Sequence, residues 1–322
     1  MELSCPNLMP AAHYYPFASG SYSTAPGLHK LETDFGNGTL DRQLFQLDQN
    51  WYHYHHNKLA CREESIHKYY QEHKLSPEAG FLAAEFILRH LLQDHPRCFV
   101  LDNHQHEAHL KNILSGEIIV FNRHNHTMVS SGYINLLDAL VSQIQEDVAI
   151  WQLEDDCDFM SLIHLCAPNH WAAEDKIGKA FSTVHAPVAD MSRMKERYQP
   201  MLHSLTRAAT FVRFAWGLAT DRRLNHHPHS PEGVKPELWQ GRQFDPEHPQ
   251  LWVRVERQTL SGLLEGKAVF FTIRTYFEKV AELSKAQQTA LVRALHSMSA
   301  ESLKYKGLTA QLDMINQYLN GL

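Results

Sequence analysis

Hydrophobic and polar residues alternate over residues 251–277, and this alternation predicts a β-hairpin. Successive side chains of a strand point to opposite sides, so every second residue shares a face. The shared faces are mixed: Trp252, Arg254, Glu256 and Gln258 on the first strand, and Phe270, Thr272, Arg274 and Tyr276 on the second, after a turn over 261–266. Two interpretations fit. The polar face lies in water, as in an ordinary antiparallel sheet, or it lines a polar pocket.

Apolar periodicity elsewhere predicts helices wrapped around further antiparallel strands. The clearest break in a helical pattern is at Ser76 and Pro77, which suit an N-cap and a first helical position between helices over 62–75 and 77–93. Further helices are predicted over 134–145, 171–179, 192–205, 285–297 and 300–318, and further strands over 147–153, 159–166 and 209–218. Antiparallel strand pairs interrupted by helices indicate an α+β fold rather than a βαβ unit.

The predicted division of the chain is simple. Residues 1–60 contain several prolines and glycines and are expected to form an extended lead-in packed on the body, and residues 61–322 are expected to form a single domain. Within that domain residues 225–249, rich in Pro, His and Gly, form a long loop or an insertion. No glycine-rich nucleotide-binding loop is present in the sequence.

Composition excludes several classes of protein. The 322 residues carry a net charge of −6 without a run of Lys and Arg, so nucleic acid is not an expected partner. No stretch reaches the length of a membrane span and no leader pattern opens the chain, so we expect a cytoplasmic protein with no membrane partner. The five cysteines include no CxxC pair, which argues against a disulfide framework and against a thiolate zinc site.

Histidine is unusually abundant, with 23 residues. Many lie in three clusters: His53, His55 and His56; His104, His106, His109, His124 and His126; and His226, His227 and His229. Such clusters can bind a metal. The alternative, which we favour from the sequence, is that these are loop histidines, because ligand sets normally lie on rigid elements.

Several motifs occur in an order and spacing that resemble one family, the catalytic alpha subunit of haem-dependent oxidative N-demethylase. The RVERQTL and FTIRTY pair is the most specific part. The motifs are Gln145–Ile150, Cys166–Trp171 with Lys176–Gly178, Val184–Val188, Arg254–Leu260 with Phe271–Tyr276, and Tyr305–Gly307. The resemblance covers most of the chain.

The resemblance implies a PAS-like antiparallel sheet with a helical cluster, wrapped by additional N- and C-terminal helices and enclosing haem b. It implies a monooxygenase that uses O2 to hydroxylate an N-methyl group of a small amine, which then releases formaldehyde. Electrons would come from NADPH through a separate flavin and iron–sulfur reductase protein. The absence of nucleotide loops and Cys-rich cluster motifs in this sequence fits that division of labour.

A haem pocket needs one strong axial donor and cations for the propionates. His185, in the HAPV motif and close to Pro187, is the first choice of iron ligand, and His164 and His170 are reserves. The resemblance also implies cofactor contacts from the residues Trp171, Lys176, Arg254, Arg257 and Arg274. Because Arg254 and Arg257 point to opposite faces, we expect Arg254 to face the pocket and Arg257 to pair with an acidic residue elsewhere.

Glu256 and Gln258 share the face of Arg254 and are the candidate catalytic residues. The carboxylate of Glu256 would hold a protonated amine and Gln258 would orient it, with Tyr276 as a further polar group of the pocket. A structural ladder of ion pairs is the alternative for this strand. Asp147 opens a predicted strand and is expected to cap or to form a salt bridge.

One departure from the family pattern concerns the substrate. The family carries Arg-x-Asn-Trp where this chain has Arg213-Phe214-Ala215-Trp216, so an amide is missing and dimethylamine is not assumed as substrate. Two other functions stay open from the sequence. One is a haem-binding PAS-like sensor or carrier without amine turnover, and the other is a non-haem metal protein that uses the histidine clusters.

Overall fold

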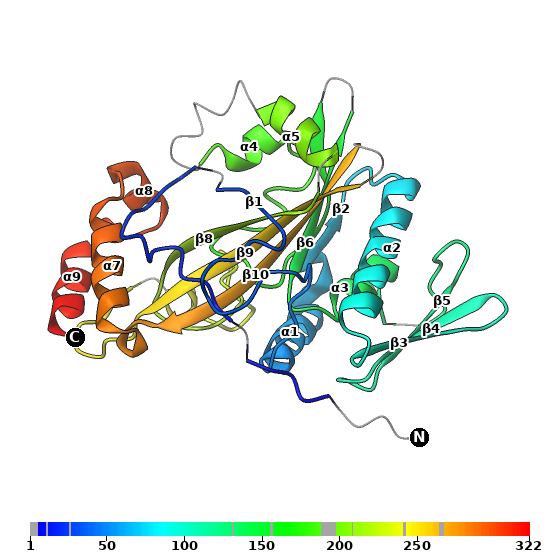
Figure 1. Ribbon diagram of the computed structural model, residues 1–322, viewed down its shortest axis with the longest axis horizontal. Coiled ribbons are helices and arrows are strands. Elements are labelled where there is room, and N and C mark those ends of the chain that lie inside the picture. The colour runs from blue at the N-terminus through cyan, green and yellow to red at the C-terminus, as the bar shows by residue number, and fades with distance from the viewer. Residues whose placement is uncertain are drawn as a thin grey trace.

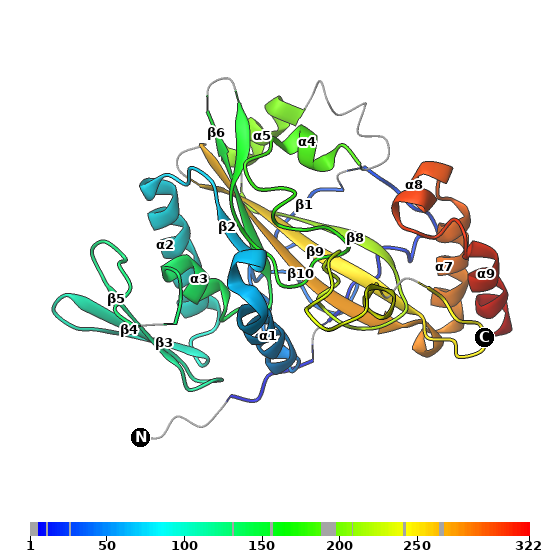
Figure 2. The same cartoon turned by 180° about the vertical axis from the view of Figure 1, so that it is seen from behind.

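The described chain forms two antiparallel sheets with helices packed around the larger one (Figures 1 and 2). The structure is a computed structural model, and it describes residues 6–10, 12–25, 27–130, 132–154, 157–187, 198–207, 209–240, 243–263 and 267–322. The α+β class predicted from the sequence is confirmed.

The large sheet runs through the middle of the molecule, and all its neighbouring strands are antiparallel. Across the sheet the strands are β1 (His29–Lys30), β8 (Phe211–Ala219), β9 (Trp252–Leu263), β10 (Ala268–Lys279), β6 (Asp147–Leu153), β7 (Asp158–His164) and β2 (Tyr70–Glu72). The predicted hairpin of residues 251–277 is the β9–β10 pair, in register from Ala268 opposite Leu263 to Lys279 opposite Trp252. It is the longest strand pair in the described chain.

Alternation along the central strands gives the sheet two apolar faces. On one face Ile150 of β6 and Phe270 of β10 pack against α2 (Pro77–Asp94) and α3 (Leu136–Val141). On the other, the adjacent residues Trp151 and Val269 pack against α5 (Tyr198–Arg207). Neighbouring residues of one strand therefore serve opposite cores, as the period of two requires.

The remaining helices cover the ends of the sheet. The helices α7 (Lys285–His296), α8 (Ala300–Tyr305) and α9 (Leu312–Gly321) gather at the end that lies on the left in Figure 1, where Leu291 and Ile315 pack on Val253 of β9. The other helices are α1 (Trp51–Tyr69), α4 (Phe181–His185), α6 (Pro236–Trp239) and the 3-10 turn η3 (Val280–Glu282). Within the described chain, no helix is long and apolar enough to cross a membrane.

A three-stranded sheet that the sequence analysis did not predict lies beside α2 (Figure 1). It consists of β3 (Phe99–Asn103), β4 (Glu107–Asn112) and β5 (Ile118–Asn122). Ala108 and Leu110 of β4 and Phe121 of β5 turn their side chains into the core around α2. His104 and His106 lie in the β3–β4 connection, His109 lies in β4, and His124 and His126 follow β5.

Several predicted helix boundaries need correction. The N-cap at Ser76 is confirmed, since its side chain accepts a hydrogen bond from Ala79 N at 3.2 Å. However, α1 begins at Trp51, so the first histidine cluster lies on a helix and not in a loop, and the helix runs across residue 60. The predicted helix over 134–145 is shorter, and the one over 300–318 is interrupted by a turn at Gly307, whose φ is +69°. A positive φ of this kind ends a helix.

Two corrections concern segments near the candidate site. Residues 171–178 form successive turns instead of a helix, closed by Gly178 with φ +72°. The predicted helix over 192–205 begins at Tyr198 within the described residues, while positions 188–197 lie outside them. His185, expected in an irregular segment, is the last residue of α4.

Candidate functional site

A cavity of about 470 Å³ lies on the face of the large sheet that carries α4. Strands β6 to β10 contribute to its wall, together with residues 169–176, α4 and the end of α8. This volume is within the roughly 300–1,000 Å³ of typical small-molecule and cofactor pockets. Of the predicted site residues, the following line it: Trp171, Lys176, His185, Arg254, Glu256 and Gln258.

His185 is held in one orientation at the cavity wall. Its Nδ1 lies 2.9 Å from the carbonyl oxygen of Phe181, and its ring stacks on the Phe181 ring with centroids 4.0 Å apart. Burial, together with the nearby charges of Arg213 and Lys176, lowers the pKa of His185 to about 4. The imidazole is therefore neutral at pH 7. With Nδ1–H donating to Phe181, the Nε2 lone pair is available to bind a metal centre.

Two cations at the cavity were not assigned a role from the sequence. Arg213 of β8 is half-buried, and its buried Nε has no hydrogen-bond partner in the part of the chain described. Lys306 follows α8, and its Nζ lies 5.3 Å from the centre of the Tyr22 ring. Both lie in motifs noted in the sequence, since Arg213 begins the RFAW run and Lys306 is in the Tyr305–Gly307 motif. These cations suit an anionic group of a ligand.

Glu256 and Gln258 form a joined pair on the cavity face of β9. Gln258 Nε2 donates to Glu256 Oε2 at 3.1 Å, and Arg254 Nε lies 3.6 Å from Glu256 Oε1. The guanidinium of Arg254 itself is occupied by the main chain, donating to the carbonyls of Ala167 at 2.6 Å and Leu224 at 3.2 Å. Arg254 thus fixes the cavity wall, while the carboxylate of Glu256 faces the cavity.

Arg257, Arg274 and Tyr276 lie on the opposite face of the sheet, so the prediction that Arg274 and Tyr276 line the pocket with Arg254 is wrong. The register explains this, because Arg274 stands opposite Arg257 and not opposite a residue of the cavity face. Arg257 pairs with Asp41 at 2.6 and 2.8 Å, as expected for the outward arginine. Arg274 pairs with Asp48. Tyr276 donates its hydroxyl to the Tyr14 carbonyl at 2.6 Å.

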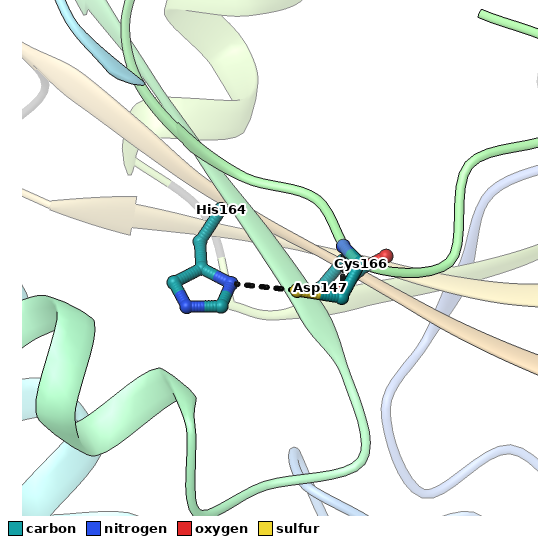
Figure 3. Close-up of side chains that lie close together, drawn as sticks. All are labelled: Asp147, His164 and Cys166. Carbon is teal, nitrogen blue, oxygen red and sulfur yellow. Dashed lines mark hydrogen bonds between the residues drawn. The ribbon is translucent and has the colours of Figure 1, made fainter. Parts of the chain in front are cut away.

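His164 is buried at the cavity wall beside Asp147 and Cys166 (Figure 3). Its Nδ1 lies 3.8 Å from the sulfur of Cys166 and its Nε2 3.3 Å from Asp138. Burial lowers the pKa of His164, but the Cys166 and Asp138 contacts outweigh it and raise the pKa to about 8. Although Nε2 has no hydrogen bond among the described residues, it faces the buried Asp138 carboxylate, so His164 is a poorer candidate for an axial ligand than His185.

Asp147 holds the chain where it leaves β7. Its Oδ1 accepts from Cys166 N at 2.9 Å and its Oδ2 from Ala167 N at 2.7 Å. The carboxylate thus caps main-chain donors, which is one of the two roles expected from the sequence. Both oxygens are engaged, so the Asp147, His164 and Cys166 group does not offer a free carboxylate to a metal ion.

His170, the other reserve, lies at the cavity with a φ of +61°. Its ring stacks on His226 with centroids 5.2 Å apart and an interplanar angle of 5°. His226 in turn contacts Asp221 at 2.7 Å and Arg254 at 3.1 Å. His170 therefore belongs to a packed stack at the rim, which ties the loop after β8 to the cavity.

Comparison with protein families gives one match that spans most of the chain. The family described as "Haem-dependent oxidative N-demethylase, alpha subunit-like" matches residues 37–315. The matched range includes the cavity residues His185, Arg213, Glu256, Gln258 and Lys306.

Proposed function

The chain belongs to the family of haem-dependent oxidative N-demethylase alpha subunit-like proteins, and from this premise we propose that its cavity binds haem b with His185 as the axial ligand. Membership implies an oxidoreductase. The finer proposal is a monooxygenase that oxidises the N-methyl group of a small amine. The geometry of His185 is the observation that supports haem binding, because a neutral imidazole with Nδ1–H fixed on a carbonyl presents the Nε2 lone pair to the iron.

The other cavity residues suit the same cofactor. Phe181, Trp151 and Phe271 supply apolar and aromatic surface around His185. Arg213 and Lys306 supply positive charge for the two propionates, and the Nε of Arg213 still lacks a hydrogen-bond acceptor among the described residues. Trp171 and Lys176 add a further aromatic group and a further cation at the cavity wall.

Haem supplies the redox chemistry that activates O2, and the proposed reaction hydroxylates an N-methyl carbon, after which the product releases formaldehyde. The residues of this chain position the substrate. Glu256 accepts hydrogen bonds from a protonated amine, a charge-assisted contact stronger than a neutral one. Gln258 holds one carboxylate oxygen at 3.1 Å and Arg254 faces the other, so the carboxylate keeps one orientation.

The substrate pocket differs from the family pattern at Ala215. This residue lines the cavity and stands opposite Glu256 in the β8–β9 pair. An asparagine there would place its amide next to the Glu256 carboxylate, since directly opposed side chains of antiparallel strands are neighbours. We therefore propose a small N-methylated amine as the substrate class without choosing dimethylamine.

The order of the central strands supports a PAS-like description of the sheet. Taken in chain order from β6 to β10, the five strands lie across the sheet as 2-1-5-4-3, so that the first and the last are neighbours in the middle. We also propose that electrons reach the site from NADPH through a separate flavin and iron–sulfur protein, and that the chain acts in the cytoplasm.

The ultraviolet–visible spectrum tests the cofactor and its ligand together. Protein produced with a haem precursor should show a Soret band that shifts with dithionite and shifts again with carbon monoxide. We expect His185→Gly to lose this spectrum and added imidazole to restore it, because free imidazole can replace the missing side chain. His170→Ala is the matched control, a cavity histidine whose loss should leave the band in place.

An unchanged Soret band in His185→Gly would overturn the ligand assignment. Loss of the band in His170→Ala with imidazole rescue would move the ligand to that residue. A haem spectrum without formaldehyde release from any N-methylated amine, in the presence of a reductant, would instead fit a haem-binding sensor or carrier.

A further inference from the structure

A second group of metal-ligating side chains lies outside the cavity. In the part of the chain described, the ligand atoms of Glu174, His227 and His229 lie within 4.8 Å of one another. Glu174 comes from the turns of residues 171–178, and the two histidines come from the loop after β8. Unlike Asp147 in the buried group of Figure 3, Glu174 has no main-chain donor on its carboxylate among the contacts described.

His227 gives an independent sign of a ligand. Its side chain is completely buried, yet its Nε2 has no hydrogen-bond partner among the described residues, and it points at Glu174 Oε1 across 3.6 Å. A buried polar atom without a partner costs free energy unless water or an ion satisfies it.

The ring of His227 is fixed before any ion binds. It meets the ring of Tyr69 edge to face with centroids 5.8 Å apart, and its own carbonyl accepts from Trp239 Nε1 at 2.6 Å. Its Nδ1 accepts a hydrogen bond from the main-chain N–H of His229 at 3.1 Å and lies 3.2 Å from the carbonyl oxygen of the same residue. A metal at Nε2 would move the ring proton to Nδ1, which would then donate to the His229 carbonyl in place of accepting from the His229 amide, and a donated Nδ1 proton is the usual support for a ligating histidine.

We propose that Glu174, His227 and His229 bind a divalent transition metal, with Zn²⁺ the ion that this donor set fits best. Two imidazoles and one carboxylate with a fourth position for water form a known zinc arrangement. Ligand atoms of a tetrahedral zinc site are roughly 3.3 Å apart, and Glu174 Oε1 lies 3.6 Å from His227 Nε2 and 3.9 Å from His229 Nδ1. Small rotations of the exposed side chains of Glu174 and His229 would bring these distances to the value expected for zinc.

The metal would join two segments that flank the cavity. The turns that carry Glu174 also carry Trp171 and Lys176, which line the cavity. The loop that carries the histidines supplies Leu224 and His226 to Arg254. Bound zinc would therefore act as a structural tether for one wall of the site, holding in place two segments that now meet through the stacked rings of His170 and His226 and through main-chain contacts.

The test measures zinc binding to haem-free, tag-free protein, so its outcome does not depend on the proposed function. Equilibrium dialysis should find one tightly bound zinc per chain, and zinc should raise the midpoint of thermal unfolding. Glu174→Ala and His229→Ala, both at exposed positions, should weaken this binding more than about 100-fold, since even supporting contacts of a ligand change affinity by about 10–100-fold. Neither variant removes a core contact.

His248→Ala is the matched control. His248 is 84% exposed, against 77% for His229, and it also lies beside a carboxylate, Asp245 at 3.2 Å, but no third ligand joins them among the described residues. It should bind zinc like the natural protein. The proposal falls if no stoichiometric zinc binds. It also falls if one zinc per chain survives in the Glu174→Ala and His229→Ala double variant, which would assign the ion to another histidine cluster.

Discussion

The two faces of the β9–β10 hairpin carry similar residues and use them differently. On the face turned from the cavity, Arg257 and Arg274 each meet a carboxylate of the N-terminal lead-in, Asp41 and Asp48. On the cavity face, Arg254 is engaged mainly by main-chain carbonyls. The first face is a set of closed ion pairs, whereas the second keeps groups at a space that can hold a ligand.

The comparison shows that charge on a strand does not identify a site. The donors of Arg257 meet the Asp41 carboxylate and the main-chain carbonyls of Gln43 and Leu44, so this arginine has nothing left to offer to a ligand. Glu256 differs because its partners, Gln258 at 3.1 Å and Arg254 at 3.6 Å, orient the carboxylate beside an open cavity. The partners of a residue, and not its type, separate structural from functional charge.

The largest expected effect comes from breaking the Arg257–Asp41 ion pair on the face turned from the cavity. Arg257→Ala leaves Asp41 buried without its cation, and removing one partner of a buried pair costs about 3–5 kcal/mol. We expect the free energy of unfolding in urea to fall by about that amount, while protein that is still folded retains its haem spectrum. Lys279→Ala, in an exposed pair with Glu282 at 3.7 Å, is the control and should change stability by less than about 1 kcal/mol. An Arg257→Ala protein as stable as the control would contradict the comparison.

The next effect is the loss of stability at low pH that is caused by His185 on the cavity face. Burial lowers the pKa of His185 from 6.5 to about 4, so between these values the unfolded chain binds more protons than the folded chain. The stability from neutral His185 is complete above pH 6.5 and is lost as the pH falls towards 4, by about 3 kcal/mol at most. The free energy of unfolding of the haem-free protein, measured across this pH range, tests the expected loss of stability. His185→Gln should flatten the decline, and an equal decline in that variant would show that other groups cause it.

The smallest effect separates substrate binding from stability. Glu256→Gln removes the charge proposed to hold the amine, and hydrogen bonds to charged groups contribute about 1.5–3 kcal/mol. Formaldehyde release at varied amine concentration should show kcat/KM lowered about 10-fold to 100-fold, with the urea midpoint nearly unchanged. Glu282→Gln, at an exposed glutamate, should leave both unchanged. Equal kinetics in the two variants would remove Glu256 from the substrate site.

Much of the fold follows from local patterns. Alternation predicted the β9–β10 hairpin, and the cap at Ser76 located the start of α2 because both signals depend on nearby residues. The start of α1 at Trp51 and the three-stranded sheet were not predicted, since their apolar residues pack on distant elements. His185 was found through its motif. Its fixed ring depends on Phe181, one helical turn earlier, which only the folded chain brings into hydrogen-bonding distance.

The site could not be predicted in full from the sequence, mainly because the register between paired strands was unknown. Alternation correctly placed Arg254, Glu256 and Gln258 on one face, but the face that Arg274 shares depends on the register between strands, and a shift of one residue reverses it. The role of Arg213 was hidden for a similar reason. Nothing in its neighbouring sequence shows that its Nε lacks a partner among the described residues, because that depends on all the elements around it.

The position of β6 beside β10 has a consequence for how the chain folds. Ile150 pairs with Phe270, so the middle of the sheet joins strands that are far apart in sequence. A growing chain can form the β6–β7 hairpin early, but β6 then waits with an unpaired edge until β10 has been made. Sheets with such distant pairing fold slowly and are exposed to aggregation. We expect refolding to be limited by this one closure, and expression at low temperature to favour it.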